Sequence, residues 1–435
     1  MEVYAYGGAR EVGRNCFLVH EKGKYIILDC GVKLGEQTEY PQIPDNMRQH
    51  IHDVVVTHAH LDHSGYLPHI FRDGLRPHVH GTKPTRDLIT VLLADYARIG
   101  GGRKGSGDAF TQKDVDMSIR NFRLHEFNQE FHTGHGFRAR LLNAGHILGS
   151  AMVMVEGDKR LLYTGDISVR GTKLLDGCER NIHCDALIME STYGDEELPS
   201  VKESMKKLVH EIKETLKEGG HVLIPSFAVG RGQEILLLLE AYMKSGALPE
   251  TKIYVEGMIG TGMKITRQNI IYANQEIQRR ILMSEDDPFK SKYFRTSRRK
   301  DKHDVFEEPS IIVSTSGMLT GGPAIGYVEK MAHNPKNKII FMGYQAEGTP
   351  GRKILEGEKE VEFHGEKIKL RMKVAEVRIS GHSGKSELIQ FAKGIKGLKK
   401  VVLIHGEEEG LNSLKESLER SYEVIIPSLG DKINI

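Results

Sequence analysis

Residues 58–63, HAHLDH, contain four potential metal ligands: His58, His60, Asp62 and His63. Imidazole nitrogens and carboxylate oxygens are common ligands of zinc and of other divalent transition metals. The segment directly follows residues 54–57, a run of β-branched residues that predicts a buried strand. Because alternate side chains of extended backbone point the same way, the first three donors can converge, and a turn beginning at the third brings the fourth to a second position. So many donors in one place favour two metal ions over a solvated histidine-rich loop.

Other donors of the same kind stand just past apolar strands elsewhere in the chain. Each of them alone would more often be a hydrogen-bonding residue than a ligand. Repetition of one local pattern favours a common centre, and the glycine beside most of these donors would let backbone approach it closely. The additional candidates are His146, Asp166, His382 and His405.

The elements that must position these donors begin with a β-rich part of the chain. Up to about residue 195, short apolar runs alternate with turns, as is typical of strands, and one helical pattern occurs at 84–98. The predicted strands are 25–29, 54–57, 137–141, 152–155, 160–164 and 186–189.

From about residue 200 the pattern changes to alternating helices and strands. Residues 202–217 have apolar side chains at helical spacing, and strands are predicted at 221–225 and 252–255. This alternation predicts an α/β unit with a parallel sheet. Past residue 351 the strand-rich pattern returns, so we expect one domain built from both chain ends and interrupted by an inserted α/β domain. The expected segments are 1–194, 195–355 and 356–435.

The composition is that of a folded protein, with 435 residues, of which 39% are hydrophobic and 28% are charged. A formal net charge of +2 excludes a polycation, so nucleic-acid binding would depend on a local basic face. We expect a cytoplasmic protein, because no apolar run reaches the roughly 18–20 residues of a membrane helix and the first residues lack a secretory-signal pattern. The four cysteines form no C-x-x-C pair, which agrees with reduced thiols.

In combination and order, these motifs resemble those of the metallo-β-lactamase superfamily, and specifically of its β-CASP nucleic-acid-processing branch. The segments 8–14, 226–234 and 343–349 look like the endonuclease subunit of the cleavage and polyadenylation specificity factor (CPSF), and less like RNase J. The chain is similar to the short archaeal CPSF-type nucleases without KH domains. The positions that match the family motifs are Asp29, residues 58–63, His146, Asp166, Glu190, His382 and His405.

The resemblance implies an α/β fold, namely a metallo-β-lactamase αββα sandwich with an inserted β-CASP domain whose sheet is mainly parallel. It also implies two zinc ions per chain. Asp29 is expected to support a ligand histidine or the loop instead of binding metal itself. The implied ligands are His58, His60 and His146 for one ion, Asp62, His63 and His405 for the other, and Asp166 as the bridge.

The implied activity is hydrolysis of phosphodiester bonds in single-stranded RNA, in a cleft between the two domains. Two ions about 3.5–4 Å apart can generate a hydroxide nucleophile and stabilise the charged transition state. His382 would then be the general acid, with Glu190 orienting it, and Asp62 is counted with them as catalytic. His405 favours RNA, since DNA-processing members typically carry valine at this motif. Both endonuclease and 5′-to-3′ exonuclease modes are compatible with these motifs.

Two alternatives belong to other functional classes. A non-catalytic RNA-binding β-CASP subunit would be expected to have lost ligands, whereas every ligand position here carries a competent donor. A small-molecule hydrolase of the superfamily is disfavoured by the long insertion and by the β-CASP motifs that bracket it. The expected partners are single-stranded RNA, a second copy in a homodimer and other RNA-processing proteins, and no membrane.

Weaker signals indicate where RNA could bind. Residues 314–317 follow a predicted strand and offer hydroxyl and N–H groups to a phosphate, although an ordinary turn fits them equally well. Residues 264–303 carry eleven Lys and Arg against five Asp and Glu, interleaved with aromatic residues, although a solvated surface is the alternative. The expected RNA contacts are Ser314, Ser316, Ser380, Arg295, Arg298 and Arg299.

The chain contains a second His-x-His pattern, formed by His78 and His80. No carboxylate is adjacent to it in the sequence. We therefore expect these two histidines to be structural and not metal-binding.

Overall fold

The computed structural model describes residues 1–35, 37–99, 110–134, 136–284, 286–296 and 304–435. They form two compact units, of which the first is built from both ends of the chain and the second is inserted into it. The first unit comprises Met1–Gly171, Leu175–Glu197 and His382–Ile435, and the second comprises Thr172–Leu174 and Leu198–Gly381.

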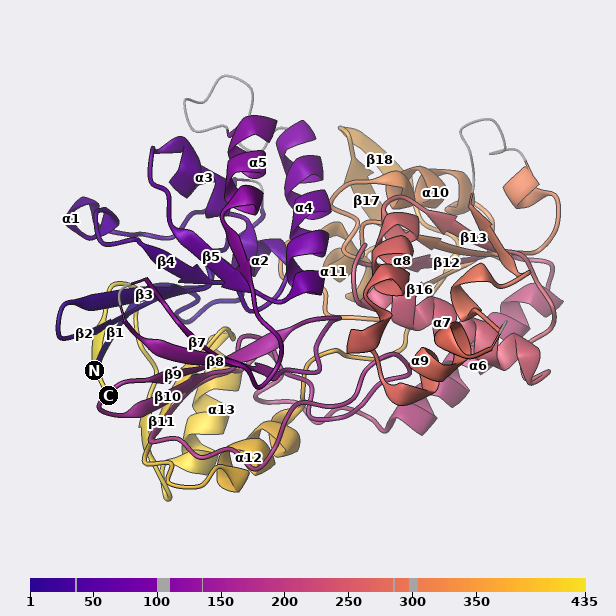
Figure 1. Cartoon of the computed structure of the whole chain (residues 1–435). Helices are drawn as coiled ribbons and strands as arrows, with labels where there is room; N and C mark the ends of the chain where they lie inside the picture. Colours follow the sequence, from indigo (N-terminus) through magenta and orange to yellow (C-terminus); the bar gives the residue numbers. More distant parts are fainter. Residues whose placement is uncertain (36, 100–109, 135, 285, 297–303) are drawn as a thin grey trace. The chain divides into compact units, whose positions relative to one another are not determined.

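The first unit contains two seven-stranded sheets (Figure 1). In order across the first sheet, the strands are β22 (Lys432–Asn434), β1 (Glu2–Gly7), β2 (Cys16–Glu21), β3 (Lys24–Leu28), β4 (Asp53–Val55), β5 (His78–Gly81) and β6 (Phe122–Leu124). In the second sheet they are β21 (Glu423–Ile425), β20 (Lys400–Ile404), β11 (Ala186–Glu190), β10 (Arg160–Tyr163), β9 (Ala151–Glu156), β8 (Arg138–Asn143) and β7 (Glu130–His132). The last strands of the chain therefore complete both sheets.

Helices cover the outer faces of the two sheets. Figure 1 shows α3, α4 and α5 over the first sheet and α12 and α13 over the second. Apolar side chains of both sheets, such as Phe17, Ile26 and Val153, form one core between them. This helix–sheet–sheet–helix order confirms the expected sandwich. The helices of this unit are α1 (Asp45–Arg48), α2 (Leu61–Ser64), α3 (Leu67–Arg72), α4 (Lys83–Arg98), α5 (Gln112–Arg120), α12 (Lys385–Gly394) and α13 (Glu408–Leu418).

The second unit is built on a six-stranded sheet in which all neighbouring strands are parallel. A separate hairpin packs into the same core. The parallel sheet confirms the α/β unit predicted from the alternation of helices and strands. The strands of the sheet, in order, are β14 (Phe294–Thr296), β13 (Ile253–Glu256), β15 (Ile311–Ser314), β12 (Val222–Pro225), β16 (Lys338–Phe341) and β19 (Lys373–Glu376), and those of the hairpin are β17 (Glu360–Phe363) and β18 (Glu366–Lys369).

The longest helix of the second unit shows why these segments become helical. In α6 (Val201–Lys217), Ser200 and Glu203 form a capping box, and buried Leu208 and Ile212 lie on one face. Within the described residues, no helix combines the length and apolarity needed to cross a membrane. The other helices are α7 (Arg231–Lys244), α8 (Ile259–Gln268), α9 (Gln275–Leu282), α10 (Pro323–Met331), α11 (Pro350–Leu355) and the 3₁₀ turns η1 (Ile270–Tyr272), η2 (Pro288–Lys290) and η3 (Asp304–Phe306).

The second unit continues to Gly381, whereas the sequence pattern placed the end of the inserted domain at residue 355. The physical reason is β19, which pairs with β16 and so extends the parallel sheet. This strand is four residues long and lies half exposed at the sheet edge, so its sequence carries little hydrophobic pattern.

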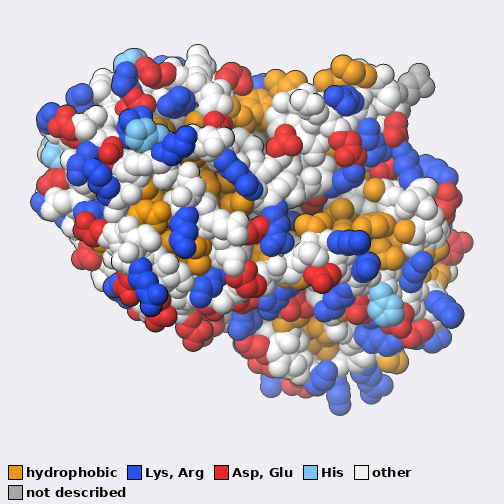
Figure 2. Space-filling model, turned by 90° about the horizontal axis from the view of Figure 1, so that it is seen from below, with side chains coloured by type: hydrophobic (Ala, Val, Ile, Leu, Met, Phe, Trp, Pro, Cys, Tyr) orange, Lys and Arg blue, Asp and Glu red, His pale blue; other side chains and the backbone are white. Residues whose placement is uncertain are grey.

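Charged side chains of both signs cover the surface. On the face shown in Figure 2, Lys and Arg are interspersed with Asp and Glu. This mixture agrees with the formal net charge of +2.

Candidate metal centre

The histidine-rich segment changes from extended chain to helix in its middle. His60 has extended backbone and is the N-cap of α2, whereas Asp62 and His63 lie inside that helix. The helix places Asp62 beside His63, whereas the alternation of extended backbone predicted that Asp62 would converge with His58 and His60. His58 and His60 lie in one cluster with His146 and Asp166, and Asp62 and His63 lie in a second cluster that His58 also approaches.

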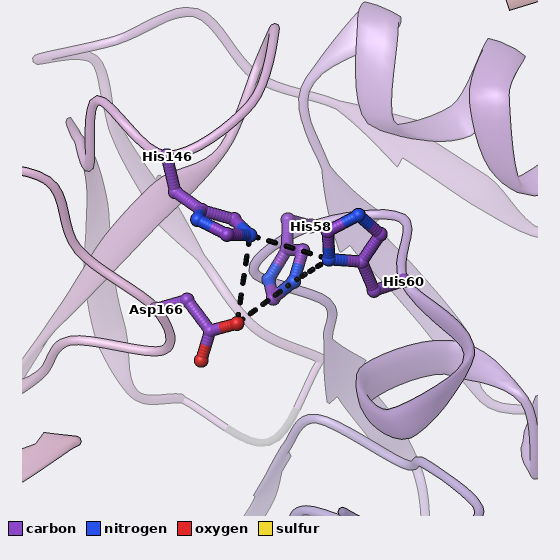
Figure 3. Close-up of side chains that lie close together, drawn as sticks. All are labelled: His58, His60, His146 and Asp166. Carbon is purple, nitrogen blue, oxygen red and sulfur yellow. Dashed lines mark hydrogen bonds and ion pairs between the residues drawn. The ribbon is translucent and has the colours of Figure 1, made fainter. Parts of the chain in front are cut away.

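The first donor group consists of four atoms that face one another (Figure 3). The Nδ1 of His60 lies 3.2 Å from the Nε2 of His58 and 3.2 Å from the Nε2 of His146. The Oδ2 of Asp166 lies 3.4 Å and 3.5 Å from the same two Nε2 atoms. Tetrahedral zinc with bonds of about 2.0–2.1 Å places its ligand atoms about 3.3–3.4 Å apart, so this group fits a zinc ion.

The second donor group uses the other oxygen of Asp166. Its Oδ1 lies 3.2 Å from the Nε2 of His63 and 3.5 Å from the Nδ1 of His405. The Oδ2 of Asp62 is 3.3 Å from the Nε2 of His405 and 3.7 Å from the Nε2 of His63. Asp166 therefore offers one oxygen to each group, and the seven expected ligands lie together.

A buried oxygen of Asp166 provides a test of whether a cation fits. The side chain is 2% exposed, and its Oδ1 accepts no hydrogen bond within the described part of the chain. A buried carboxylate oxygen without a donor is costly, and a bound cation would satisfy it. The donor set and this oxygen both fit divalent metal ions.

Strand ends and tight loops bring the distant donors together. His146, Asp166 and His405 follow β8, β10 and β20, which lie in one sheet. Gly145 and Gly165 have positive φ, and a Cβ atom would lie 2.7 Å from Ser168 O at the first and 2.7 Å from Thr57 Oγ1 at the second. Only glycine allows these close approaches, which are to neighbouring chain segments and not to the donor atoms themselves.

Asp29 lies behind His63 and outside the two donor groups. The Oδ2 of Asp29 is 2.6 Å from the Nδ1 of His63 and accepts from the Tyr163 hydroxyl at 2.7 Å. The amide and hydroxyl of Thr57 also donate to Asp29, at 2.7 Å and 2.8 Å. A fixed carboxylate at Nδ1 orients the ring so that the Nε2 of His63 faces Asp166.

Burial and neighbouring charges shift the pKa values of the residues in the centre in different directions. Burial lowers the pKa of His58 well below its usual value, which favours the neutral imidazole that binds metal. Burial also disfavours the charged form of His63, but the carboxylates of Asp166, Asp29 and Asp62 together raise its pKa well above the usual value. The pKa of Asp166 lies well below its usual value, since the surrounding histidines outweigh the effect of burial.

His382 stands beside the donor groups and is held by Glu190. Its Nδ1 lies 3.0 Å and 2.9 Å from the two carboxylate oxygens of Glu190, and its Nε2 lies 3.9 Å from Asp166 Oδ2. Glu190 is fully buried and accepts from the Ile167 amide at 2.7 Å and from the Thr192 hydroxyl at 2.5 Å. The imidazole is therefore fixed at one nitrogen, while the other faces the centre.

The backbone is strained at two of the site positions. Asp29 has a φ of 59° and His405 has a φ of 48°, in the left-handed region that is rare for residues other than glycine. The amide of His405 donates to Gly8 O at 2.8 Å, and its carbonyl accepts from the Ser191 amide at 3.1 Å. Such conformations concentrate at functional sites, where surrounding contacts maintain them.

The expected RNA-contacting serines of the second unit differ in exposure. Ser314 is fully buried at the end of β15, and its hydroxyl points to Thr315 O at 3.4 Å. That burial leaves the hydroxyl inaccessible to a ligand in this structure. Ser316 is partly exposed and accepts from the Thr320 amide at 3.0 Å.

The other expected RNA contacts are placed as follows. Ser380 is partly exposed and lies two residues before His382 in the chain. Arg295 is exposed in β14 and donates to the carbonyls of Lys292 and Phe294. Arg298 and Arg299 lie outside the described residues.

Two residues that contact the centre, Thr192 and Asn15, were not predicted from the sequence. Thr192 lies between two site residues, because its Oγ1 donates to Glu190 and is 3.2 Å from the Nδ1 of His405. The Nδ2 of Asn15 lies 3.1 Å from the Nε2 of His63, and Asn15 is buried. Thr192 could have been found from its place two residues after Glu190, whereas Asn15 carries no such signal.

The sandwich fold and the histidine–aspartate cluster at its strand ends define a metallo-hydrolase. Models of three protein families match the chain: the metallo-β-lactamase superfamily at residues 9–218, the β-CASP domain at 232–354 and the Zn-dependent metallo-hydrolase RNA specificity domain at 367–427. The chain belongs to the β-CASP family of the metallo-β-lactamase superfamily, which confirms the resemblance seen in the motifs. It is a metal-dependent hydrolase that acts on RNA.

Similar proteins cover almost the whole chain. The transcription termination factor FttA of Methanothermobacter thermautotrophicus is 36% identical over 440 residues, which are 97% of this chain and 69% of that protein. FttA of Methanocaldococcus jannaschii is 36% identical over 451 residues, with 99% and 71% covered. A crystal structure of a protein of unknown function from Enterococcus faecalis V583 shares the fold, with a TM-score of 0.58, 15% identity and 99% of each chain covered.

Proposed function

We propose that this protein is a zinc-dependent ribonuclease that hydrolyses phosphodiester bonds of single-stranded RNA at a centre with two metal ions. The observation that carries this proposal is the position of Asp166, whose two oxygens face separate donor groups. A carboxylate placed in this way suits a bridge between two ions. When bound, such ions supply an activated water and stabilise the charge that develops on the phosphate.

The protein's own residues would hold and orient this centre. His58, His60 and His146 would bind one ion, and Asp62, His63 and His405 would bind the other. Asp29 would keep the Nε2 of His63 directed at the centre through its contact with Nδ1. The side chain of Asp62 is 30% exposed, so one carboxylate of the centre reaches solvent and can orient a water molecule there.

His382 would donate the proton that the leaving oxygen requires. Glu190 fixes its Nδ1 and, as a buried carboxylate, stabilises the protonated ring. The Nε2 of His382 faces the centre at 3.9 Å from Asp166 Oδ2, a position that supports proton donation at the centre. This arrangement supports general-acid catalysis by His382, with Glu190 as its positioning residue.

The relatives named transcription termination factor suggest where the activity is used. Their similarity extends over 97% and 99% of this chain, and so includes both units. We extend the proposal to cleavage of RNA in transcription termination or in a related RNA-processing step. The alternative is a non-catalytic RNA-binding subunit, which the complete donor set disfavours.

One RNA, labelled separately at each end, tests the activity and its mode. The substrate is offered with a 5′-monophosphate, with a 5′-triphosphate and as a circle, to the wild type, to Asp166→Ala and to Asp158→Ala. Asp158 is an exposed carboxylate of the same unit, so its variant is the matched control. Cutting of the circle establishes endonuclease action, and release of 5′ nucleotides from the linear RNA establishes the exonuclease mode. Turnover by Asp166→Ala, with its zinc content measured, would refute the proposed centre.

A further inference from the structure

A second group of histidines and a carboxylate lies at the opposite end of β4 from the metal centre. Asp53 begins β4, and His78 and His80 lie on the neighbouring strand β5 (Figure 1). The parallel register pairs Asp53 with His78 and Val55 with His80. Because alternate side chains point the same way, the three polar side chains project from one face of the sheet. Strand pairing thus supplies the carboxylate that is missing beside the second His-x-His pattern in the sequence.

The distances within this group suit a metal ion. The Oδ1 of Asp53 lies 3.0 Å from the Nε2 of His80 and 3.8 Å from the Nδ1 of His78. One ligand atom from each residue lies within 4.8 Å of the others. A tetrahedral zinc ion separates its ligand atoms by about 3.3–3.5 Å, a value between the two measured distances.

The three side chains differ in burial, and this difference suits the binding of an ion that arrives from solvent. Asp53 and His80 have side chains that are 0% and 4% exposed, whereas that of His78 is 45% exposed. Two donors are thus held in place by the fold, and the third lies at the surface where an ion can arrive. Two imidazoles and one carboxylate form a donor set that zinc and other divalent transition metals accept.

The surroundings hold His80 and Asp53 in place. The Nδ1 of His80 is 2.9 Å from the Nε2 of His125, whose ring stacks on Phe131 at a centroid distance of 3.7 Å. The amide of Gly134 donates to the Oδ1 of Asp53 at 3.1 Å. Partners of this kind, which fix a ligand histidine through its second nitrogen, accompany most metal sites.

The tautomer of His80 decides between two states of this group. If its Nδ1 donates to His125, the Nε2 lone pair faces the carboxylate at 3.0 Å, and two acceptors so close require a proton or a metal cation between them. If its Nε2 donates to Asp53, the group is a metal-free hydrogen-bonded chain.

We infer that Asp53, His78 and His80 bind a divalent transition-metal ion at a site separate from the catalytic centre. Asp53 precedes His58 by five residues of extended chain, which corresponds to a distance on the order of 15 Å. The ion would connect β4 to β5 and, through the contact of Asp53 with Gly134, to the turn after β7. Its role would be structural, so its loss would leave RNA cleavage intact.

Zinc content of the purified full-length protein tests this inference. The wild type, His78→Ala and His210→Ala are equilibrated with zinc, passed over a desalting column and analysed for metal per chain. His210 is an exposed histidine of α6 whose Nε2 lies 3.5 Å from Glu214 Oε2, so its variant controls for the loss of a surface imidazole. We expect His78→Ala to bind one zinc ion fewer than the wild type and the control, with equal RNA cleavage in all three. Equal zinc content in His78→Ala and the wild type would overturn the inference.

A second measurement needs no variant. Anomalous diffraction from wild-type crystals grown with zinc, recorded on both sides of the zinc absorption edge, should show a peak between Asp53, His78 and His80. The absence of a peak there would overturn the inference even if His78→Ala failed to fold. The Asp166→Ala variant separates the two proposals, because it should lose cleavage and zinc at the catalytic centre while keeping the peak at Asp53.

Discussion

The two ends of β4 carry histidine–aspartate groups with different architecture. Beyond its carboxyl end, six donor residues that follow strands of both sheets surround Asp166, and each oxygen of that carboxylate faces its own donor group. At its amino end, three donors come from two adjacent strands, and Asp53 directs a single oxygen at both histidines.

The two arrangements of donors suit different roles, one catalytic and one structural. A shared carboxylate can hold two ions at the short spacing that phosphodiester hydrolysis requires, and the Nε2 of His382 lies 3.9 Å from its Oδ2. In the smaller group, one carboxylate oxygen faces both histidines, and the described residues that form the group include no equivalent of His382. Its contacts join neighbouring strands. The first group is therefore suited to chemistry and the second to stability.

The largest expected effect is that of Asp166→Ala. Removing the shared carboxylate should lower kcat for RNA cleavage by about 10³-fold or more, because several kcal/mol of transition-state stabilisation by the metal ions is lost. The measurement is single-turnover cleavage of end-labelled RNA, with RNA affinity and zinc content determined on the same sample. His78→Ala should cleave at the wild-type rate. A comparable loss of cleavage in both variants would remove the functional distinction between the two groups.

His382→Ala should have the next largest effect, a fall in kcat of about 10²–10⁴-fold, as expected for loss of a general acid. Zinc content should stay at the wild-type level, since the imidazole lies beside the donor groups. Glu190→Gln should reduce kcat less and should displace the pH profile, because the amide still contacts His382 without its charge. An RNA with a leaving group of low pKa should restore much of the rate in His382→Ala, and absence of that restoration would argue for a purely structural role.

Asp29→Asn should weaken the catalytic centre without abolishing it. The carboxylate contacts the Nδ1 of His63 at 2.6 Å, and loss of such a partner typically lowers metal affinity by about 10–100-fold. Competition with a chromogenic chelator measures the zinc affinity, and excess zinc should restore cleavage. Asp158→Asn, a change at an exposed carboxylate, is the control. Unchanged zinc affinity in Asp29→Asn would show that the contact does not tune the site.

Local sequence patterns predicted the segment 58–63 and several core strands, such as β3, β9 and β11, because alternation and donor spacing are properties of neighbouring residues, but they did not predict β1 and β2. The assignment of individual ligands rested on resemblance to the family. The edge strand β19 was missed, because a short and half-exposed strand has little pattern of its own. The partner of the second His-x-His pattern was missed for another reason: Asp53 reaches His78 only through the parallel pairing of β4 with β5, and no local spacing reports such a pairing. The contacts of Thr192 with His405 and of Asn15 with His63 also join residues far apart in the sequence, so no local spacing predicts them.

The smallest expected effect concerns the stability that zinc gives to the amino end of β4. In the Asp166→Ala background, zinc at 100 times its Kd should stabilise the folded first unit by about 2.7 kcal/mol through the Asp53 group. Adding His78→Ala should remove most of this gain, because the two remaining donors bind zinc far more weakly, whereas adding His210→Ala should leave it unchanged. Thermal unfolding with and without zinc measures the three proteins. Equal zinc-dependent shifts in all three would assign the stabilisation to residues outside the Asp53 group, and β4 would then carry a metal ion at one end only.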